Sequence, residues 1–561
     1  MAEMLTRSEN GGLTAVAYRG DGATLLAFDV DEELAGDLAG FALEFTPPGG
    51  RPTPIRNRLS FDAPITAETT PEERVWTPTD QAPLQKFHWI HRPADVEPGE
   101  FRYRVSAKLF DSGGGLKSGP STEVALELLD EGYKDLDLGF TRAYISSQAY
   151  AAIFNNAEIA PDHPTIDFSS TPYEKQWSWL GFHARKLIFD FLAETLADDG
   201  LSLDVFAYDL DEPDFIRGLK DLGPRLRLFL DDAELHAETG DPEVAAHQLL
   251  ADSAGAENVK TGHFSRFAHD KVMIQRRGKE ALKVLSGSAN FSIRGLYVQA
   301  NNVFVFRDQQ VAAWYSEAFE QAWDDPSGFS RGDIAKGWFE RDGGDLPQTA
   351  LSFSPHVSAD ISLDRVADAI AGAQSSVLFS VMELGGGGRV MDELHRLPDR
   401  DLYAFGTTQY RDGDLSVTSP NHPAVAVPFA YLHDKVPAPF QAEIAGGAGQ
   451  VIHNKFVVVD FNGDDPTVFA GSSNLAKGGE EENGDNLVCF SDSKLASTYA
   501  VEAIRLTDHY RFRAVQQDAT SDEPLTLKKR AEDWVPDYFD PANAKFRERN
   551  LFVGEEAPNT R

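Results

Sequence analysis

The sequence contains one cysteine, Cys489, among its 561 residues. A single thiol cannot form an internal disulfide, so the fold depends on a packed core and not on covalent cross-links. No stretch approaches the roughly 18 consecutive apolar residues of a membrane span, and the first residues lack the basic and apolar regions of a signal peptide. These absences predict a cytoplasmic protein without a transmembrane segment.

Positive charge is also scarce. The 52 Lys and Arg residues stand against 89 Asp and Glu residues, which gives a formal net charge of −37 at pH 7. Such a charge repels polyanions, including nucleic acids and anionic lipid surfaces, so any phosphate-binding site has to be a local exception. Hydrophobic residues make up 42% of the chain, as in packed proteins, and the length exceeds what one core usually holds. We therefore expect several domains.

The first 130 or so residues alternate short apolar segments with Gly- and Pro-rich turns such as PPGG and DSGGG. This pattern predicts β-strands at 13–18, 23–30, 41–45, 101–110 and 123–128. The segment that begins PGEFRYRV is similar to the closing strands of fibronectin type III or immunoglobulin-like modules. The sequence thus predicts an all-β sandwich over residues 1–135.

Helices then alternate with apolar strands in two successive rounds, which is typical of α/β proteins. The first round predicts helices at 177–196 and 214–222 and strands at 201–208 and 226–230. The second predicts helices at 363–373 and 388–397 and strands at 375–382 and 402–407. We expect two α/β lobes, over residues 136–345 and 346–561.

The two rounds are a duplication. His269 and His453 are separated by 453 − 269 = 184 residues. The same offset relates six further pairs of identical residues: Lys271 and Lys455, Gly287 and Gly471, Ser288 and Ser472, Asn290 and Asn474, Asn302 and Asn486, Asp308 and Asp492. Seven coincidences at one offset indicate an internal repeat.

Each repeat carries H-x-K followed by G-S-x-N: His269-Asp270-Lys271 with GSAN, and His453-Asn454-Lys455 with GSSN. In an extended segment, residues two apart face the same side, so each H-x-K presents an imidazole and an ammonium together. The paired motifs resemble those of the phospholipase D superfamily, H-x-K-x4-D followed by G-S-x-N, over residues 136–520. The resemblance implies two α/β/α lobes related by a pseudo-twofold axis.

Cleavage of a phosphodiester requires an in-line nucleophile, an acid that protonates the leaving oxygen, and fixed positive charge around the other oxygens. The resemblance implies that His269 attacks phosphorus to form a phosphohistidine and that His453 is the general acid and base. Further candidate site residues are Lys271, Lys455, Asn290 and Asn474 for holding phosphate oxygens, and Ser288 and Ser472 for binding or positioning them. This chemistry uses no metal and no cofactor.

The two repeats differ at two positions. The second H-x-K motif has its later Asp, Asp460, whereas the first has Arg276 at the matching place. Eleven residues after the motif Asn, where relatives often place a carboxylate that bonds an imidazole, the second repeat has Asp485 and the first has Asn301. The sequence leaves open which histidine Asp485 orients.

Several other residues have plainer interpretations. A third H-x-K, at His433 and Lys435, has no G-S-x-N at the shared gap and is predicted to be a coincidence in a surface loop. The acidic run 480–482 is predicted to be solvated. Tyr208 and Asp209 lie at the end of a predicted strand, where they border the site without a specific signal.

We expect a phospholipase D-type phosphodiesterase that hydrolyses or transfers a phospholipid headgroup. The net charge favours a phospholipid over nucleic acid as the substrate. One alternative is a nuclease of the same superfamily, and the other is an inactive duplicated scaffold, which Arg276 and Asn301 keep open. Because both motifs lie in one chain, the site does not require dimerisation and we expect a monomer.

Overall fold

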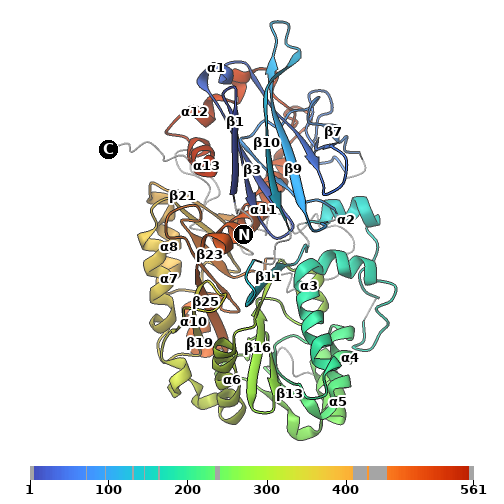
Figure 1. Ribbon diagram of the computed structural model, residues 1–561, viewed down its shortest axis with the longest axis vertical. Helices are drawn as coiled ribbons and strands as arrows, with labels where there is room; N and C mark the ends of the chain where they lie inside the picture. The colour runs from blue at the N-terminus through green and yellow to red at the C-terminus, as the bar shows by residue number, and fades with distance from the viewer. Residues whose placement is uncertain are drawn as a thin grey trace.

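The structure is a computed structural model that describes residues 5–70, 73–94, 96–128, 132–143, 146–161, 164–233, 241–408, 426–428 and 452–554. A β-rich domain lies at one end of the molecule, and two α/β lobes lie side by side beneath it (Figure 1). Among the residues just given, no helix is both long and apolar enough to cross a membrane.

The N-terminal domain consists of two four-stranded antiparallel sheets, which confirms the prediction of a β-rich sheet domain. The first contains β1 (Leu5–Asn10), β2 (Leu13–Arg19), β3 (Thr24–Val30) and β8 (His88–His91). The second contains β10 (Leu116–Glu127), β9 (Glu100–Phe110), β4 (Leu38–Thr46) and β5 (Thr53–Pro54). Alternate residues of β9 are buried, as expected for a strand with one face on a core. The fibronectin- or immunoglobulin-like character stays a prediction.

The C-terminal segment packs against this same domain. Ala531, Trp534, Val535 and Tyr538 are buried in the sandwich core, and Trp534 Nε1 donates a hydrogen bond to the carbonyl of Leu38 at 3.2 Å. Two helices, α12 (Pro536–Phe539) and α13 (Ala544–Val553), belong to this segment. The sequence predicts that this segment follows the second lobe as a C-terminal tail, and the structure shows its apolar residues in the core of the N-terminal domain.

The first lobe has a seven-stranded mixed sheet. In spatial order its strands are β11 (Leu136–Phe140), β17 (Asn302–Phe306), β16 (Glu280–Gly287), β15 (Val272–Arg277), β12 (Ser202–Ala207), β13 (Leu226–Asp231) and β14 (Val259–Gly262). Its main helices are α3 (Glu174–Ala197), α4 (Pro213–Leu222), α5 (Pro242–Ala254) and α6 (Gln309–Asp324). The predicted alternation of helices and strands is therefore present.

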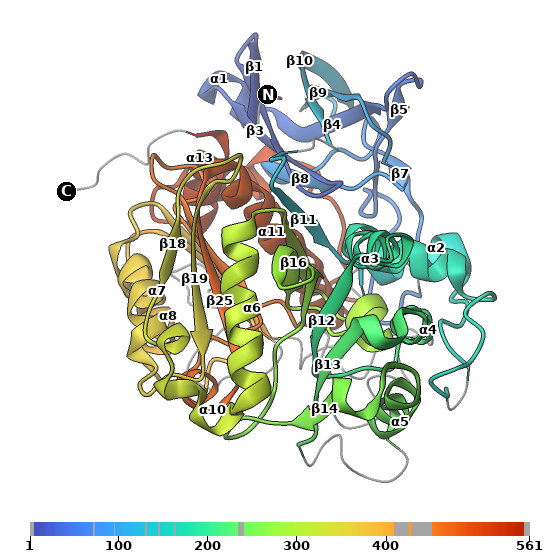
Figure 2. The same ribbon diagram turned by 60° about the horizontal axis from the view of Figure 1, so that its bottom comes forward.

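The second lobe has an eight-stranded sheet with the same arrangement. Its order is β18 (Phe339–Arg341), β19 (Gln348–Ser354), β25 (Asp485–Ser491), β24 (Thr467–Gly471), β23 (Phe456–Val459), β20 (Ser376–Val381), β21 (Tyr403–Thr408) and β22 (Ala426–Pro428). Its main helices are α7 (Asp360–Gly372), α8 (Arg389–Arg396), α10 (Lys477–Glu482) and α11 (Ser493–Asp518). Figure 2 shows α4 and α5 outside one sheet, α7 and α8 outside the other, and α6 between them.

Matching strands of the lobes keep the repeat register. Asp204 of β12 pairs with Ile274 of β15, as Leu378 of β20 pairs with Val458 of β23. Asp308 and Asp492 accept hydrogen bonds from the first backbone N–H groups of α6 and α11, so this repeated aspartate is a helix cap and not part of the chemistry. The pseudo-twofold pair of α/β lobes is confirmed.

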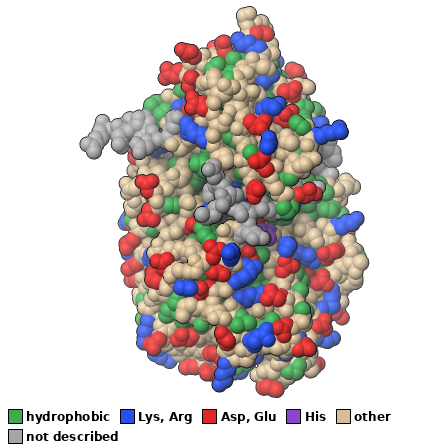
Figure 3. Space-filling model, viewed as in Figure 1, with side chains coloured by type: hydrophobic (Ala, Val, Ile, Leu, Met, Phe, Trp, Pro, Cys, Tyr) green, Lys and Arg blue, Asp and Glu red, His purple; other side chains and the backbone are tan. Residues whose placement is uncertain are grey.

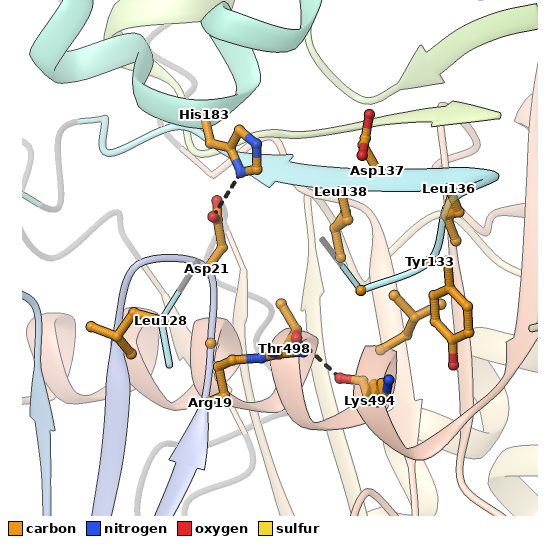
Figure 4. Close-up of a pocket in the computed structure, with 13 residues that line it drawn as sticks. Arg19, Asp21, Leu128, Tyr133, Leu136, Asp137, Leu138, His183, Lys494 and Thr498 are labelled. Atoms are coloured by element: carbon orange, nitrogen blue, oxygen red, sulfur yellow. Dashed lines mark hydrogen bonds and ion pairs between the residues drawn. The ribbon is translucent and has the colours of Figure 1, made fainter. Parts of the chain in front are cut away.

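The sandwich meets both lobes around a small cavity of about 90 Å³, drawn in Figure 4. His183 of α3 donates from Nδ1 to Asp21 of the β2–β3 turn at 2.9 Å, as the dashed line in Figure 4 marks. The Asp21 carboxylate raises the pKa of His183 against the opposing effect of burial, so the two form an ion pair. This contact ties the N-terminal domain to the first lobe.

Candidate active site

The two H-x-K motifs meet between the lobes. Lys271 directly precedes β15 and Lys455 directly precedes β23, so each motif lies in the extended segment that leads into a central strand. The ring centroids of His269 and His453 are 6.5 Å apart, with an angle of 64° between the rings. Both imidazoles are largely buried, at 6% and 3% exposure. The repeats therefore form one centre and not two.

Each histidine is oriented by the opposite lobe. His269 Nδ1 lies 2.7 Å from Asp485 Oδ1, and His453 Nδ1 lies 2.9 Å from Asn301 Oδ1. The structure thus pairs Asp485 with His269, which the sequence alone left open. Since Nδ1 faces the orienting oxygen in both rings, Nε2 of each ring is the nitrogen available for chemistry.

Residues of the opposite lobe also bond the middle residue of each H-x-K motif. Asn486 Nδ2 donates to Asp270 Oδ1 at 2.6 Å, and Asn302 Nδ2 donates to Asn454 Oδ1 at 3.0 Å. The backbones of the two lobes are also in contact, because residues 268 and 484 form a β-bridge, as do residues 300 and 452. Neither lobe contains a complete site by itself.

The G-S-x-N segments support these pairs from behind. Gly287 and Gly471 have φ values of +147° and +139°, and a Cβ on either would lie 2.3 Å from a carbonyl oxygen of the adjacent strand. That close approach requires glycine. Ser288 Oγ donates to Asn301 Oδ1 at 2.8 Å, and Ser472 accepts from the backbone N–H of Asn486 at 3.0 Å. Both serines are 0% exposed, and their hydroxyls are held by the Asn301 side chain and by the Asn486 backbone.

The lysines supply the positive charge. Lys455 Nζ donates to the carbonyl of His453 at 2.7 Å, and Lys271 Nζ makes the equivalent bond to the carbonyl of His269. Burial lowers the pKa of Lys271 to about 8, against the opposing effect of nearby carboxylates, of which that of Asp485 is the largest. Burial, followed by the charge of Lys271, holds the pKa of Lys455 well below its ordinary value. An anion placed between them would relieve both penalties.

The motif asparagines lie at the strand ends. Asn290 Nδ2 donates to Asp209, whereas Asn290 Oδ1 and Asn474 Oδ1 are buried without a hydrogen-bond partner among the described residues. Tyr208 packs edge-on to His269, with ring centroids 4.8 Å apart, and its ring centroid lies 4.7 Å from Lys271 Nζ. Tyr208 and Asp209 therefore belong to the centre, although the sequence carried no specific signal for them.

The two imidazoles differ electrostatically. Burial lowers the pKa of His269 and the Lys271 ammonium lowers it further, but the Asp485 carboxylate opposes both. Burial, followed by the charges of Lys455 and Lys271, holds the pKa of His453 well below its usual range. Its partner Asn301 is neutral and offers no opposing charge. The environment of each ring therefore disfavours its charged form, and more strongly so at His453.

Asp460 and Arg276 lie away from the chemistry. The Asp460 carboxylate accepts hydrogen bonds from the backbone N–H groups of Gln374, Ser375 and Ser376, at 2.7–3.1 Å. These bonds fix the turn before β20, so Asp460 is structural. Arg276 instead lies 2.7 Å from Asp204 and 2.6 Å from Glu320, in an ion-pair network.

Some functional residues were missed or misjudged from the sequence. Asp270 was not singled out, yet it is buried beside Asp485, and burial raises its pKa to about 7. Glu480 was predicted to be solvated, and that was wrong: it is 2% exposed and accepts hydrogen bonds from the hydroxyls of Ser362 and Ser473. The third H-x-K, from His433, lies outside the described residues.

The fold and site define a two-lobed α/β protein with one histidine-paired centre between its lobes. Residues 201–323 match the sequence model of the family described as "Cardiolipin synthase, PLD-like domain". This segment, which contains His269, Lys271 and Asn290, is a phospholipase D-like domain, and the resemblance to that superfamily is confirmed. No curated protein matches the sequence.

Three solved structures are among those that the chain matches. Phosphatidylserine synthase from Haemophilus influenzae is 12% identical, and the match covers 65% of this chain and 91% of that one at a TM-score of 0.39. Polyphosphate kinase from Porphyromonas gingivalis is 11% identical over 62% of this chain, at a TM-score of 0.38, and the chain spans about half, 52%, of its length. Nuc, a phospholipase D family member from Salmonella typhimurium, is 22% identical over 24% of this chain and 85% of that one, at a TM-score of 0.20. With TM-scores below 0.5, these similarities assign no substrate.

Proposed function

We propose that this protein is a metal-independent phosphodiesterase that cleaves a phospholipid headgroup by way of a phosphohistidine. The observation that carries the proposal is the pair of buried imidazoles, 6.5 Å apart, each oriented through Nδ1 by the opposite lobe. Two Nε2 atoms left available on rings whose centroids are 6.5 Å apart suit an in-line displacement.

The proposed reaction has two displacements. His269 Nε2 attacks phosphorus, forming a P–N bond as the P–O bond to the leaving alcohol breaks, and His453 Nε2 donates a proton to that oxygen. His453 then removes a proton from water, whose oxygen attacks phosphorus and breaks the P–N bond. His269 and protonated His453 are regenerated, and the products are an alcohol and a phosphate monoester. A second alcohol in place of water gives transfer instead of hydrolysis.

The residues around the two imidazoles have different roles in these displacements. Asp485 holds the Nδ1 proton of His269 and stabilises the positive charge that the ring acquires when Nε2 bonds to phosphorus. Lys271 and Lys455 stabilise the equatorial oxygens, together with Asn290 and Asn474. A bound phosphodiester anion raises the pKa of His453, which lets this ring carry the proton that it donates.

The preference for a phospholipid rests on charge. The chain has a formal net charge of −37, which disfavours a long polyanion. On the face of the molecule in Figure 3, acidic and basic side chains are interspersed, without the continuous basic track that typically follows a nucleic-acid backbone. A single headgroup phosphate needs only the local positive charge of the two buried lysines.

The test is a two-substrate assay in excess EDTA. Choline release from phosphatidylcholine micelles and cleavage of a labelled single-stranded oligonucleotide are measured for the wild type, His269→Ala and the control His263→Ala, whose imidazole is half exposed. We expect choline release that is lost in His269→Ala and kept in His263→Ala. Oligonucleotide cleavage without choline release would make the protein a nuclease, and no turnover of either substrate would favour a scaffold.

A further inference from the structure

A second cavity, of about 450 Å³, lies between the sandwich and the second lobe. Its walls come from three segments that are far apart in the sequence: residues 57–59 and 84–89 of the sandwich, residues 508–515 of α11, and residues 526–548 of the C-terminal segment. None of its lining residues takes part in the histidine-paired centre. Its volume falls within the range of small-molecule sites.

The lining is positively charged although the chain as a whole is strongly acidic. Five cationic residues line the cavity: Arg58, Lys86, Arg511, Lys528 and Lys545. Only two carboxylates line it, those of Asp508 and Glu548, and Asp537, which does not line it, lies 2.8 Å from Lys545 Nζ, so the cations exceed these carboxylates by 5 − 3 = 2. In a chain with a net charge of −37, such a local positive excess favours the binding of an anion.

Both carboxylates are already engaged within the protein. Asp508 lies 2.7 Å from Lys86 Nζ and 3.0 Å from His88 Nε2, while Glu548 lies 2.9 Å from His88 Nδ1. His88 therefore bridges two carboxylates, which raise its pKa against the effect of burial and the neighbouring Lys86.

Aromatic and apolar groups share the cavity with these cations. The Arg58 guanidinium lies 3.3 Å from the ring centroid of Phe512, and Lys545 Nζ lies 5.3 Å from that of Tyr538. Trp89 and Trp534 also line the cavity, and Val515 is 48% exposed beside them. A ligand here meets positive charge and flat apolar surface at the same time.

We propose that this cavity binds a phosphate monoester that carries an aromatic or apolar group. The monoester dianion matches the excess positive charge better than a singly charged diester, and the organic group would contact the Phe512, Trp89 and Val515 side. The cations come from all three wall segments, so the ligand bridges the sandwich, α11 and the C-terminal segment. A soluble nucleotide and the headgroup of a phosphatidate share this chemistry.

The experiment measures binding by isothermal titration calorimetry. The probes are adenosine 5′-monophosphate and dihexanoyl phosphatidic acid below its micelle concentration, with adenosine as the probe that lacks phosphate. The proteins are the wild type, Lys528→Glu, Arg58→Ala and the control Lys529→Glu, which changes the exposed neighbour that does not line the cavity. His453→Ala separates this site from the histidine-paired centre, and thermal melting verifies the folding of each variant.

We expect one or both phosphate probes to bind with 1:1 stoichiometry, and this binding to persist in His453→Ala. Affinity should fall about 10-fold in Lys528→Glu, more in Arg58→Ala, and less than about 2-fold in Lys529→Glu. Binding of only the nucleotide would identify a soluble ligand, and binding of only the phosphatidate would identify a lipid headgroup. The proposal is overturned if neither phosphate probe binds, if binding disappears in His453→Ala, if adenosine binds equally well, or if Lys528→Glu and Lys529→Glu behave alike.

Discussion

The two halves of the histidine-paired centre have nearly the same geometry and opposite electrostatic character. His269 lies beside the carboxylate of Asp485, and the residue after it, Asp270, is a second buried acid. His453 lies beside the amide of Asn301 and is followed by a second amide, Asn454. Duplication thus preserved the positions of the orienting groups while their charges diverged.

That difference assigns roles that symmetry alone would leave equal. A carboxylate stabilises an imidazole that becomes positively charged when it forms a P–N bond, whereas an amide fixes the orientation of the ring without favouring its charge. The comparison therefore favours His269 as the nucleophile and His453 as the acid and base. Four predictions test this assignment and the other differences between the two repeats, beginning with the largest expected effect.

Loss of either imidazole should stop turnover, but in different ways. We expect His269→Ala and His453→Ala each to lower kcat by at least about 10⁴-fold, because neither displacement has a substitute group. With a substrate whose leaving group needs no proton, such as a p-nitrophenyl phosphodiester, His453→Ala should still release the first product and trap phosphate on His269. Equal inactivity of both variants in this single-turnover assay would contradict the assignment.

Exchange of the orienting groups should have the next largest effect. Asp485→Asn removes the charge that stabilises the phosphohistidine, and we expect activity to fall about 10²–10⁴-fold. Asn301→Asp adds a charge beside His453, and we expect a change of about 10-fold or less. The double exchange Asp485→Asn and Asn301→Asp is the sharper test, since peptide mapping of trapped phosphate then shows whether the nucleophilic role follows the carboxylate to His453.

Asp460 and Arg276 occupy the position of the motif's last aspartate in the two repeats. Substitutions of either residue should affect stability and not chemistry. Asp460→Ala leaves several backbone N–H groups before β20 without their acceptor, and we expect the free energy of unfolding to fall by about 2–4 kcal/mol, with Asp460→Asn losing less. Arg276→Met should cost about 1–2 kcal/mol, since Asp204 keeps Arg227 as a partner.

Arg277→Met is the control for Arg276→Met, because Arg277 pairs with Asp198 at the exposed end of the same strand. Its cost should be below about 0.5 kcal/mol. Chemical denaturation measures all four free energies. Equal costs for the two arginine variants would show that the network around Arg276 contributes no more than a surface ion pair.

The smallest effect concerns pH. Burial raises the pKa of Asp270 to about 7, above its value in the unfolded chain, so the folded state holds this proton more tightly. The contribution to stability is complete below about pH 4 and is lost as pH rises through 7. Asp270→Asn, which copies the Asn454 arrangement, should therefore melt about 2–4 °C higher than the wild type at pH 8 and show no such gain at pH 4. A difference that does not vary with pH would contradict the shifted pKa.

Much of the fold could be predicted because its signals are local. The strands of the sandwich, the alternation of helices and strands, and the repeat of His269 and His453 all follow from periodicity or spacing. The residue types of the centre could be anticipated for the same reason, since the H-x-K and G-S-x-N segments carry them in sequence.

The remaining features depend on contacts between distant segments. Asp485 meets His269 only because the lobes cross at the pseudo-twofold axis, 216 residues apart in the chain. Glu480 looked like part of a solvated acidic run, but the hydroxyls of Ser362 and Ser473 enclose it once α10 packs near α7. The charge pattern of a segment does not reveal which member of a run turns inward.

The sandwich core contains Trp534 and Tyr538 alongside Phe41 and Phe87, so its first and last contributions are separated by nearly the whole chain. On a ribosome, residues 5–128 emerge long before the segment that fills their core. Until synthesis reaches that segment, the sandwich exposes an apolar surface to which a chaperone can bind. A truncation that removes residues 531–554 would therefore destabilise the N-terminal sandwich first, and this domain would open and be degraded.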